Sequence, residues 1–157
     1  MKDNVILEVK NVEKFFYGNK KLFQKDRPVV KAVNDVSFTI NEGETFGIVG
    51  ESGCGKSTLG RTVIRLLNPT NGQVIYKGTD LATLSGEEMR KLRQEIQIIF
   101  QDPFSSLQPR MPVGEIIGEA VREHGLVSKE EFDDYIDQVM DNCGLQPFHK
   151  DRYPHEF

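Results

Sequence analysis

The fold class is decided by the stretch Gly50-Glu51-Ser52-Gly53-Cys54-Gly55-Lys56-Ser57-Thr58, a complete G-x-x-x-x-G-K-[ST] phosphate-binding loop. Residues 45–49, before it, have the β-branched and aromatic character of a strand, and residues 58–67, after it, carry apolar residues at helical spacing. This strand–loop–helix context predicts an α/β fold with a nucleotide site. The alternative, a glycine-rich turn with an unrelated lysine, explains the loop but not its flanks.

The chemistry expected of the loop follows from its backbone. Its glycines allow positive φ and close approach, so that successive N–H groups can point at phosphate oxygens. The helix that follows adds the partial positive charge of its N-terminus. We expect Lys56 to reach the β- and γ-phosphates, the Ser57 hydroxyl to ligate a bridging Mg²⁺, and Thr58 to bond on the α-phosphate side.

Composition sets outer limits on function. The chain has 157 residues, 38% of them hydrophobic and 28% charged, with a formal net charge of −4. This length allows one ordinary domain with a core, and the acidic balance argues against a nucleic acid partner. Because no apolar run is long enough to span a bilayer and the first residues lack a signal-peptide pattern, we expect a cytosolic location. Basic residues from Lys10 to Lys31 and acidic residues within 119–141 are interpreted as solvated surfaces.

Cysteine and histidine add no further site. The cysteines, Cys54 and Cys143, share no metal-like or redox-like spacing, which predicts no disulfide. Cys54 fits the loop because it is small, and Cys143 falls on an apolar helical position and is predicted to lie in the core. The histidines are scattered. We therefore expect no metal other than Mg²⁺ accompanying the nucleotide.

The segments before the loop predict strands. Residues 5–9 and 36–40 have strand composition, and the second segment alternates apolar with polar side chains. Residues 41–44 predict a turn into the strand that enters the loop. Residues 17–30 show no period and are predicted to form an exposed connection.

The segments after the loop continue the α/β pattern. Residues 68–72 are expected to stop the loop helix, and 73–78 to form a strand and turn. Ser85 begins a helix with a capping box. Residues 96–100 predict a buried strand, and the polar residues at its carboxyl end stand where α/β sheets place ligands.

The last third of the chain predicts a loop and two helices. Residues 101–112 are rich in Pro, Ser and Gln and are predicted to be a loop, whereas 113–124 and 128–143 have helical patterns that Gly125 and Gly144 would stop. The apolar stripe of the second helix comprises Phe132, Tyr135, Ile136, Val139, Met140 and Cys143.

Further segments carry a resemblance to a known family. The loop with its flanks (49–59), Ile98-Ile99-Phe100-Gln101-Asp102-Pro103 with the character of a Q-loop, and the segments 105–111, 32–38 and 152–157 match together. The sequence resembles the amino-terminal part of the nucleotide-binding subunit of an ATP-binding cassette (ABC) transporter, most closely the dipeptide and oligopeptide importer group. The resemblance covers nearly the whole chain.

The resemblance implies a fold class: an α/β, P-loop NTPase (RecA-like) core with an antiparallel β subdomain, part of a helical subdomain and an incomplete parallel sheet. Residues 1–100 would form the amino-terminal part of the ATPase core, with the β subdomain and the phosphate loop. Residues 101–157 would contain the Q-loop and the start of the helical subdomain. Without later parallel strands, the strand entering the loop would have an unpaired edge.

The resemblance also implies site residues. Phe16 would stack on adenine, with Phe15 and Tyr17 as adjacent alternatives. Gln101 would contact Mg²⁺ or the attacking water, so that Lys56 and Gln101 are the catalytic candidates and Ser57 and Gln101 the metal-ligand candidates. The implied nucleotide-binding residues are Phe16, Gly50, Glu51, Ser52, Gly53, Cys54, Gly55, Lys56, Ser57 and Thr58.

ATP and Mg²⁺ are the implied cofactors. The implied partners are transmembrane permease subunits docking on residues 102–113, a second homologous ATPase subunit and, indirectly, a solute-binding protein. Such a subunit is cytoplasmic and peripheral on the inner face of the cell membrane, and it transports peptides or a related solute.

Three motifs of the family are absent: the Ser-Gly-Gly-Gln signature, a strand ending in Asp-Glu, and a switch histidine. Asp102 replaces the carboxylates poorly because Pro103 follows it. Phosphoryl transfer depends on positioning and charge neutralisation, so we expect this chain to bind nucleotide with little or no hydrolysis. A self-contained small P-loop nucleotide-binding or kinase-like protein, with Asp102 as the metal carboxylate, is the alternative.

Overall fold

The computed structural model describes residues 4–19 and 27–157. It divides into two compact units, Met1–Ile96 and Gln97–Phe157, which are treated separately. The middle of the predicted 17–30 connection, with part of the basic run, lies outside the described residues. So do the first three residues, in which no signal-peptide pattern was recognised.

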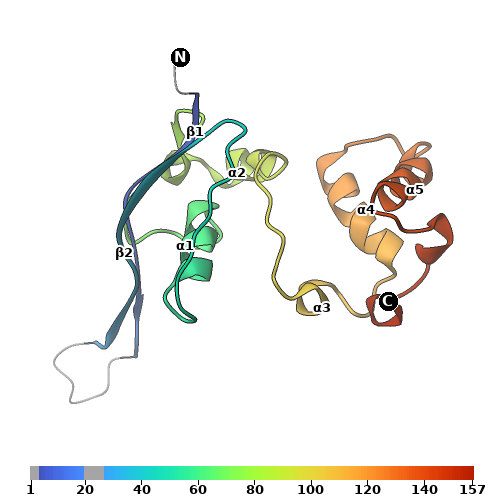
Figure 1. The fold of residues 1–157 in the computed structure, drawn as a ribbon. Coiled ribbons are helices and arrows are strands. Elements are labelled where there is room, and N and C mark those ends of the chain that lie inside the picture. The colour runs from blue at the N-terminus through green and yellow to red at the C-terminus, as the bar shows by residue number, and fades with distance from the viewer. Residues whose placement is uncertain (1–3, 20–26) are drawn as a thin grey trace. The chain divides into compact units, whose positions relative to one another are not determined.

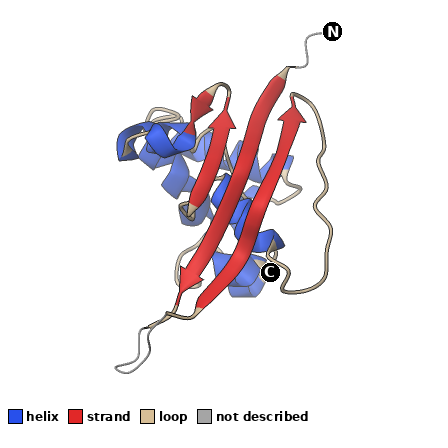
Figure 2. Ribbon diagram, turned by 90° about the vertical axis from the view of Figure 1, so that its left-hand side faces the viewer, coloured by secondary structure: helices blue, strands red, loops and turns tan. Residues whose placement is uncertain are grey.

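An antiparallel sheet organises the first unit (Figures 1 and 2). Its strand order is β2-β1-β3-β4, with β1 paired to both β2 and β3. The strands predicted over 5–9, 36–40 and 73–76 are confirmed, although the first two extend to 13 residues each. The elements are β1 (Val5–Tyr17), β2 (Val29–Asn41), β3 (Asn71–Tyr76) and β4 (Thr79–Asp80).

Irregular pairing explains why periodicity underestimated β1 and β2. The register shifts between Val9 and Val12, where Asn11 has φ 46° and interrupts the alternation of faces. The Asn11 N–H donates to the Ser37 hydroxyl (2.8 Å), and its side-chain amide donates to Asp35 (2.8 Å). Beyond this bulge the ladder continues to residues 17 and 29, so the predicted connection was wrong at both of its ends.

The core of the first unit lies between the sheet and α1 (Lys56–Val63), which contacts β1 and β2. It also takes in Leu81 of the short 3₁₀ helix η1 (Leu81–Thr83). Its buried residues are Val9, Val12, Val33, Leu59, Val74 and Leu81. Apolar burial of this kind is the main term that holds a helix against a sheet.

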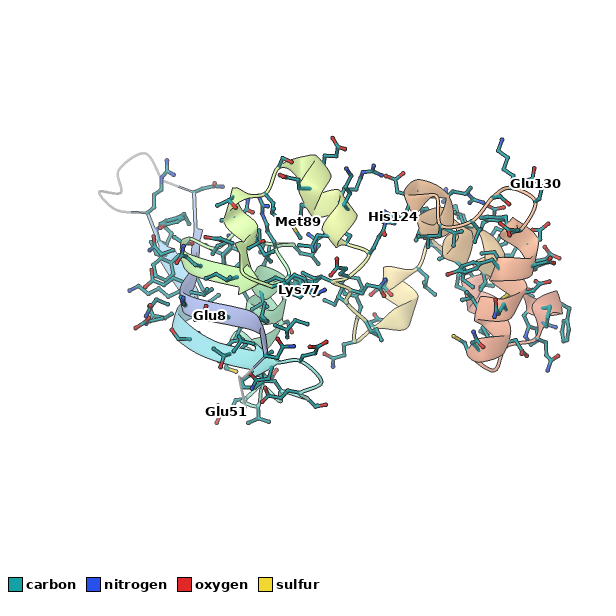
Figure 3. The ribbon with its side chains drawn as sticks, turned by 90° about the horizontal axis from the view of Figure 1, so that it is seen from above. Glu8, Glu51, Lys77, Met89, His124 and Glu130 are labelled. Carbon is teal, nitrogen blue, oxygen red and sulfur yellow. The ribbon has the colours of Figure 1, made fainter. Side chains whose placement is uncertain are left out.

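The helices of the first unit follow the prediction in part. α1 begins two residues earlier and ends four residues earlier than the predicted 58–67, because Arg65 turns the chain with φ 55°. α2 (Gly86–Leu92) has the predicted capping box: Glu88 N–H donates to the Ser85 hydroxyl (3.3 Å), and Ser85 N–H donates to the Glu88 carboxylate (2.8 Å). Met89 is the buried side chain of α2 (Figure 3).

The strands predicted over 45–49 and 96–100 were wrong: neither segment is a strand. Val49 is 94% exposed and Ile99 is 98% exposed. An extended segment becomes a strand only when a neighbour takes up its N–H and C=O groups, and all paired strands among the described residues are antiparallel pairs of β1–β4. Apolar composition alone was therefore not sufficient to predict a strand in these two segments.

The second unit is helical. It contains α3 (Pro103–Ser106), α4 (Val113–His124), α5 (Phe132–Asn142) and the 3₁₀ helices η2 (Pro147–His149) and η3 (Pro154–Glu156). α4 matches its predicted bounds, and Gly125 ends it with φ 58°. The predicted 101–112 loop was wrong at α3. α5 starts later than predicted because the Ser128 hydroxyl and the Glu131 carboxylate bond to each other (2.8 Å) before the helix.

Val121, Ile136 and Met140 are buried between α4 and α5. Cys143 was predicted to join this core, but it is exposed, because α5 ends at Asn142 and the stripe ends with it. Gly118 faces the same contact: a Cβ there would lie 2.4 Å from Phe132 Cζ. In the described part of the chain, none of the helices is both long and apolar enough to cross a membrane.

Candidate functional site

The loop between residues 50 and 55 ends at the N-terminus of α1. Gly53 has φ 81° and Gly55 has φ 99°, the left-handed region that favours glycine. A Cβ on Gly55 would lie 2.1 Å from the carbonyl oxygen of Ala32, so the loop packs directly against the backbone of β2. This close approach explains why glycine is required at position 55.

Lys56 folds back into the loop. Its Nζ donates to the carbonyl oxygens of Gly50 (2.7 Å) and Glu51 (2.6 Å), and it lies 3.7 Å from Cys54 Sγ. Glu51 itself points away from the loop (Figure 3). A full positive charge therefore lies within the loop, next to the N-terminus of α1, and both features favour an anion there.

The helix behind the loop is well anchored. Leu59 is buried in the core, and the buried Thr62 hydroxyl donates to the Thr58 carbonyl oxygen (2.7 Å). Residues 50–54 and Ser57 are exposed. One side of α1 is thus packed in the core while Ser57 and the loop are open to solvent, which is the arrangement that a phosphate-binding site needs.

The three aromatic candidates differ in their surroundings. Phe16 is 42% exposed and has the Lys14 ammonium 5.3 Å from its ring centroid. Phe15 is half-buried, with Lys31 at 5.1 Å from its ring, and Tyr17 is 58% exposed. Successive side chains of a strand point to opposite faces, so Phe16 lies on the other face of β1 from its two neighbours.

Lys14 was missed by the sequence analysis. It pairs across the ladder with the buried Val33, and its Nζ donates to the carbonyl oxygen of Asn68 (2.7 Å), in the connection that follows α1. Lys14 therefore ties the Phe16 ring to the connection between α1 and β3. The only sequence signal was the spacing of two residues between Lys14 and Phe16.

Gln101 and Asp102 belong to the second unit, so the loop geometry does not include them. Gln101 is exposed. Asp102 starts α3: its Oδ1 accepts the N–H of Ser105 (3.3 Å), and its carbonyl oxygen accepts the Ser105 hydroxyl (3.4 Å). A helix cap accounts for an aspartate at this place. Over residues 4–19 and 27–157, three or more His, Cys, Asp or Glu residues nowhere gather as a metal site would require.

The chain was compared with known families and proteins. Residues 33–157 match the family described as "ABC transporter". The chain is 49% identical over 153 residues to the oligopeptide transport ATP-binding protein AppF of Bacillus subtilis. The alignment covers 97% of this chain and 46% of AppF. It is 42% identical to a probable peptide ABC transporter ATP-binding protein of Sinorhizobium fredii, over 98% of this chain and 43% of that protein. The chain thus spans somewhat less than half the length of these relatives.

Solved structures with a similar fold include an ATP-binding cassette and a part of an ABC transporter complex. The ATP-binding cassette MJ0796, solved as a dimer in a post-hydrolysis state bound to ADP and Pi, superposes with a TM-score of 0.77 at 25% identity, over 96% of this chain and 62% of that one. CbiO1 of Clostridium perfringens, part of the transporter complex cbiONQ, has a TM-score of 0.71 at 23% identity, over 98% and 56% of the two chains. The predicted fold class, a P-loop α/β cassette with an antiparallel β subdomain, is confirmed.

Proposed function

This chain belongs to the ABC transporter family, and from that premise we propose that it carries the nucleotide-binding part of an importer ATPase subunit. In this proposal the complete subunit couples MgATP binding and hydrolysis to the uptake of peptides or a related solute. The oligopeptide and peptide transport names of its relatives support the solute class.

The Lys56 geometry is the observation that carries the proposal. Its ammonium is already inside the loop, where it donates to the carbonyl oxygens of Gly50 and Glu51 and lies close to Cys54 Sγ. On nucleotide binding, Lys56 would exchange these neutral acceptors for charged phosphate oxygens, and charge-assisted hydrogen bonds are the stronger ones. The N–H groups of residues 53–57 would hold the same phosphates.

Ser57 and Gln101 are the residues proposed to hold Mg²⁺. Ser57 is exposed in the first turn of α1, where its hydroxyl can reach a cation bridging the phosphates. When bound, the ion would neutralise phosphate charge. Phe16 is the proposed adenine platform, because its ring is partly exposed while Lys14 holds it in place from the side.

The proposed partners follow from the same role. Transmembrane permease subunits would dock on residues 102–113, a second homologous ATPase subunit would face the nucleotide, and a solute-binding protein would act through the permease. The location would be the cytoplasmic face of the membrane. We propose that the chain by itself binds nucleotide with little or no hydrolysis, since hydrolysis needs carboxylates that orient Mg²⁺ and water.

The kinase-like alternative depends on Asp102 acting as a metal carboxylate. The hydrogen bonds that join Asp102 to Ser105 at the start of α3 favour a structural role instead. Phosphate release that persists with ATP and disappears in Asp102→Ala would restore this alternative.

Calorimetric titration of the chain with ATP and Mg²⁺ tests the nucleotide site. We expect Lys56→Ala to weaken ATP by at least about 10-fold, since hydrogen bonds to charged groups contribute about 1.5–3 kcal/mol. Lys91→Ala is the matched control, because Lys91 is an exposed lysine on α2 that pairs with Glu87 (3.3 Å) on the helix surface. An ATP affinity for Lys56→Ala within a few-fold of the unsubstituted chain would sink the proposal.

A further inference from the structure

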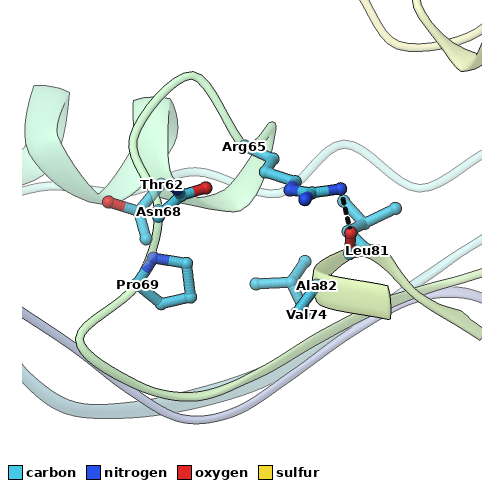
Figure 4. Close-up of a pocket in the computed structure, with 7 residues that line it drawn as sticks. All are labelled: Thr62, Arg65, Asn68, Pro69, Val74, Leu81 and Ala82. Atoms are coloured by element: carbon cyan, nitrogen blue, oxygen red, sulfur yellow. Dashed lines mark hydrogen bonds between the residues drawn. The ribbon is translucent and has the colours of Figure 1, made fainter. Parts of the chain in front are cut away.

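A cavity lies at the opposite end of α1 from the phosphate loop. It has a volume of about 240 Å³ and is lined by residues of α1, the connection to β3, β3 itself and η1 (Figure 4). This volume is below the roughly 300–1,000 Å³ of sites for drug-sized ligands, so a nucleotide is too large for it. The lining residues are Thr62, Arg65, Asn68, Pro69, Val74, Leu81 and Ala82.

Charged, polar and apolar residues all line the cavity. Val74 and Leu81 are core residues with almost no exposed surface, whereas Pro69 and Ala82 are less buried and lie opposite each other in Figure 4. The Thr62 hydroxyl is already bonded to the Thr58 carbonyl oxygen. The polar groups left to meet a ligand are the Arg65 guanidinium and the Asn68 side-chain amide.

Hydrogen bonds hold the Arg65 guanidinium in place through one of its three nitrogens. Its Nη1 donates to the carbonyl oxygens of Leu81 and of Leu84 (3.0 Å for the latter). Its Nε and Nη2 donate to none of the described residues. A guanidinium fixed through one nitrogen, with two further donors free, matches the fork with which arginine binds a carboxylate.

The surroundings of Arg65 carry excess positive charge. Arg93 donates to the carbonyl oxygens of Ile64 and Arg65, the latter at 3.1 Å, so two arginines lie at the C-terminal end of α1. Burial and the charge of Arg65 lower the pKa of Arg93. None of the carboxylates in the described ranges forms an ion pair with either arginine.

The charges nearby do not cancel this excess. The end of a helix supplies only about half a negative elementary charge, against two full positive ones. Lys14, bonded to the Asn68 carbonyl oxygen at 2.7 Å, adds a third. Asp80 precedes η1, but its carboxylate is bonded to the Ala82 N–H (2.9 Å) and to Gln73 (3.0 Å).

We propose that this cavity binds a short, branched aliphatic monocarboxylate, whose carboxylate meets Arg65 and Asn68 and whose apolar body lies between Pro69 and Ala82. The site is separate from the phosphate loop and does not depend on the proposed nucleotide chemistry. Because it is built on the end of α1, the helix that starts with Lys56, its occupant would contact the same rigid element as the nucleotide.

Calorimetry or saturation-transfer NMR with 4-methylpentanoate tests the site, with 4-methylpentanamide as the uncharged ligand of the same shape. We expect the amide to bind at least about 10-fold more weakly, because it loses the charge-assisted bonds. Equal binding of acid and amide, or no binding of the acid, would overturn the proposal.

Variants locate the ligand. Ala82→Leu fills the cavity and leaves every Arg65 hydrogen bond in place, so it should weaken the acid at least about 10-fold without unfolding the chain, as circular dichroism would verify. Arg65→Gln should weaken it similarly. Arg61→Gln, an exposed arginine of the same helix, is the matched control and should leave binding unchanged. Unchanged binding in Ala82→Leu, or its loss in Lys56→Ala, would place the acid elsewhere and refute the assignment.

Discussion

Replacing Gly55 by alanine is the sharpest test of the loop geometry. A Cβ at this position would lie 2.1 Å from the Ala32 carbonyl oxygen, which belongs to the β2 backbone and cannot swing away. The residue also has φ 99°, where an L side chain costs about 1–2 kcal/mol. Relieving such overpacking typically costs a further 1–3 kcal/mol or so. Together these effects predict that Gly55→Ala destabilises the first unit by about 2–5 kcal/mol.

The same substitution five residues later, at Gly60, is the control. Gly60 is inside α1, and a Cβ there would meet nothing within 4 Å. Gly60→Ala should therefore stabilise the chain by about 0.5–1 kcal/mol, through helix propensity alone. Urea denaturation followed by far-UV circular dichroism measures both variants, and hydrogen exchange at Val12 and Val74 assigns the change to the first unit. A Gly55→Ala variant within about 0.5 kcal/mol of the unsubstituted chain would refute the packing of the loop on β2.

Three further predictions concern single contacts. Phe16→Ala should weaken ATP by about 1–3 kcal/mol in calorimetry, the usual cost of losing an aromatic partner for a base, whereas an equal loss in Phe15→Ala would move the adenine role to that residue. Gly118→Ala should destabilise the second unit by about 1–3 kcal/mol in urea, because its Cβ would lie 2.4 Å from an α5 ring, and an unchanged midpoint would contradict the α4–α5 contact. The Ser85 side chain and N–H lower the pKa of Glu88, so Ser85→Ala should raise that pKa toward its ordinary value in an NMR titration. Because the pKa of Glu88 is lower in the folded chain than in the unfolded one, its contribution to stability is complete above the unfolded pKa and is lost as pH falls through the folded pKa. An unchanged Glu88 pKa in Ser85→Ala would contradict the capping box.

Short-range chemistry was predictable from the sequence. The loop that ends at the start of α1, the Ser85 capping box and the bounds of α4 depend on residues within a few positions of one another, and each lies where it was predicted. Gly125 illustrates the reason: a helix followed by glycine ends because glycine adopts the left-handed conformation that closes the last turn.

Long-range pairing was not predictable in the same way. The bulge at Asn11 interrupts the alternation on which strand prediction relies, and the ladder then continues through cross-strand partners twelve to twenty-four residues away. Residues 45–49 have strand composition but no pairing neighbour, and they are not a strand. Cys143 fits the apolar stripe of α5, yet the helix ends one residue before it.

The amino-acid sequence by itself determined the phosphate loop, its lysine and the family resemblance, because these depend on residue types at fixed spacing in one short segment. Only the tertiary structure decided that Lys56 turns back onto the carbonyl oxygens of Gly50 and Glu51, and that Arg93 donates to the carbonyl oxygens of Ile64 and Arg65 at the far end of α1. Those contacts join segments up to 29 residues apart. They form only when burial of Leu59 and its neighbours brings α1 onto the sheet, and no local pattern encodes that approach.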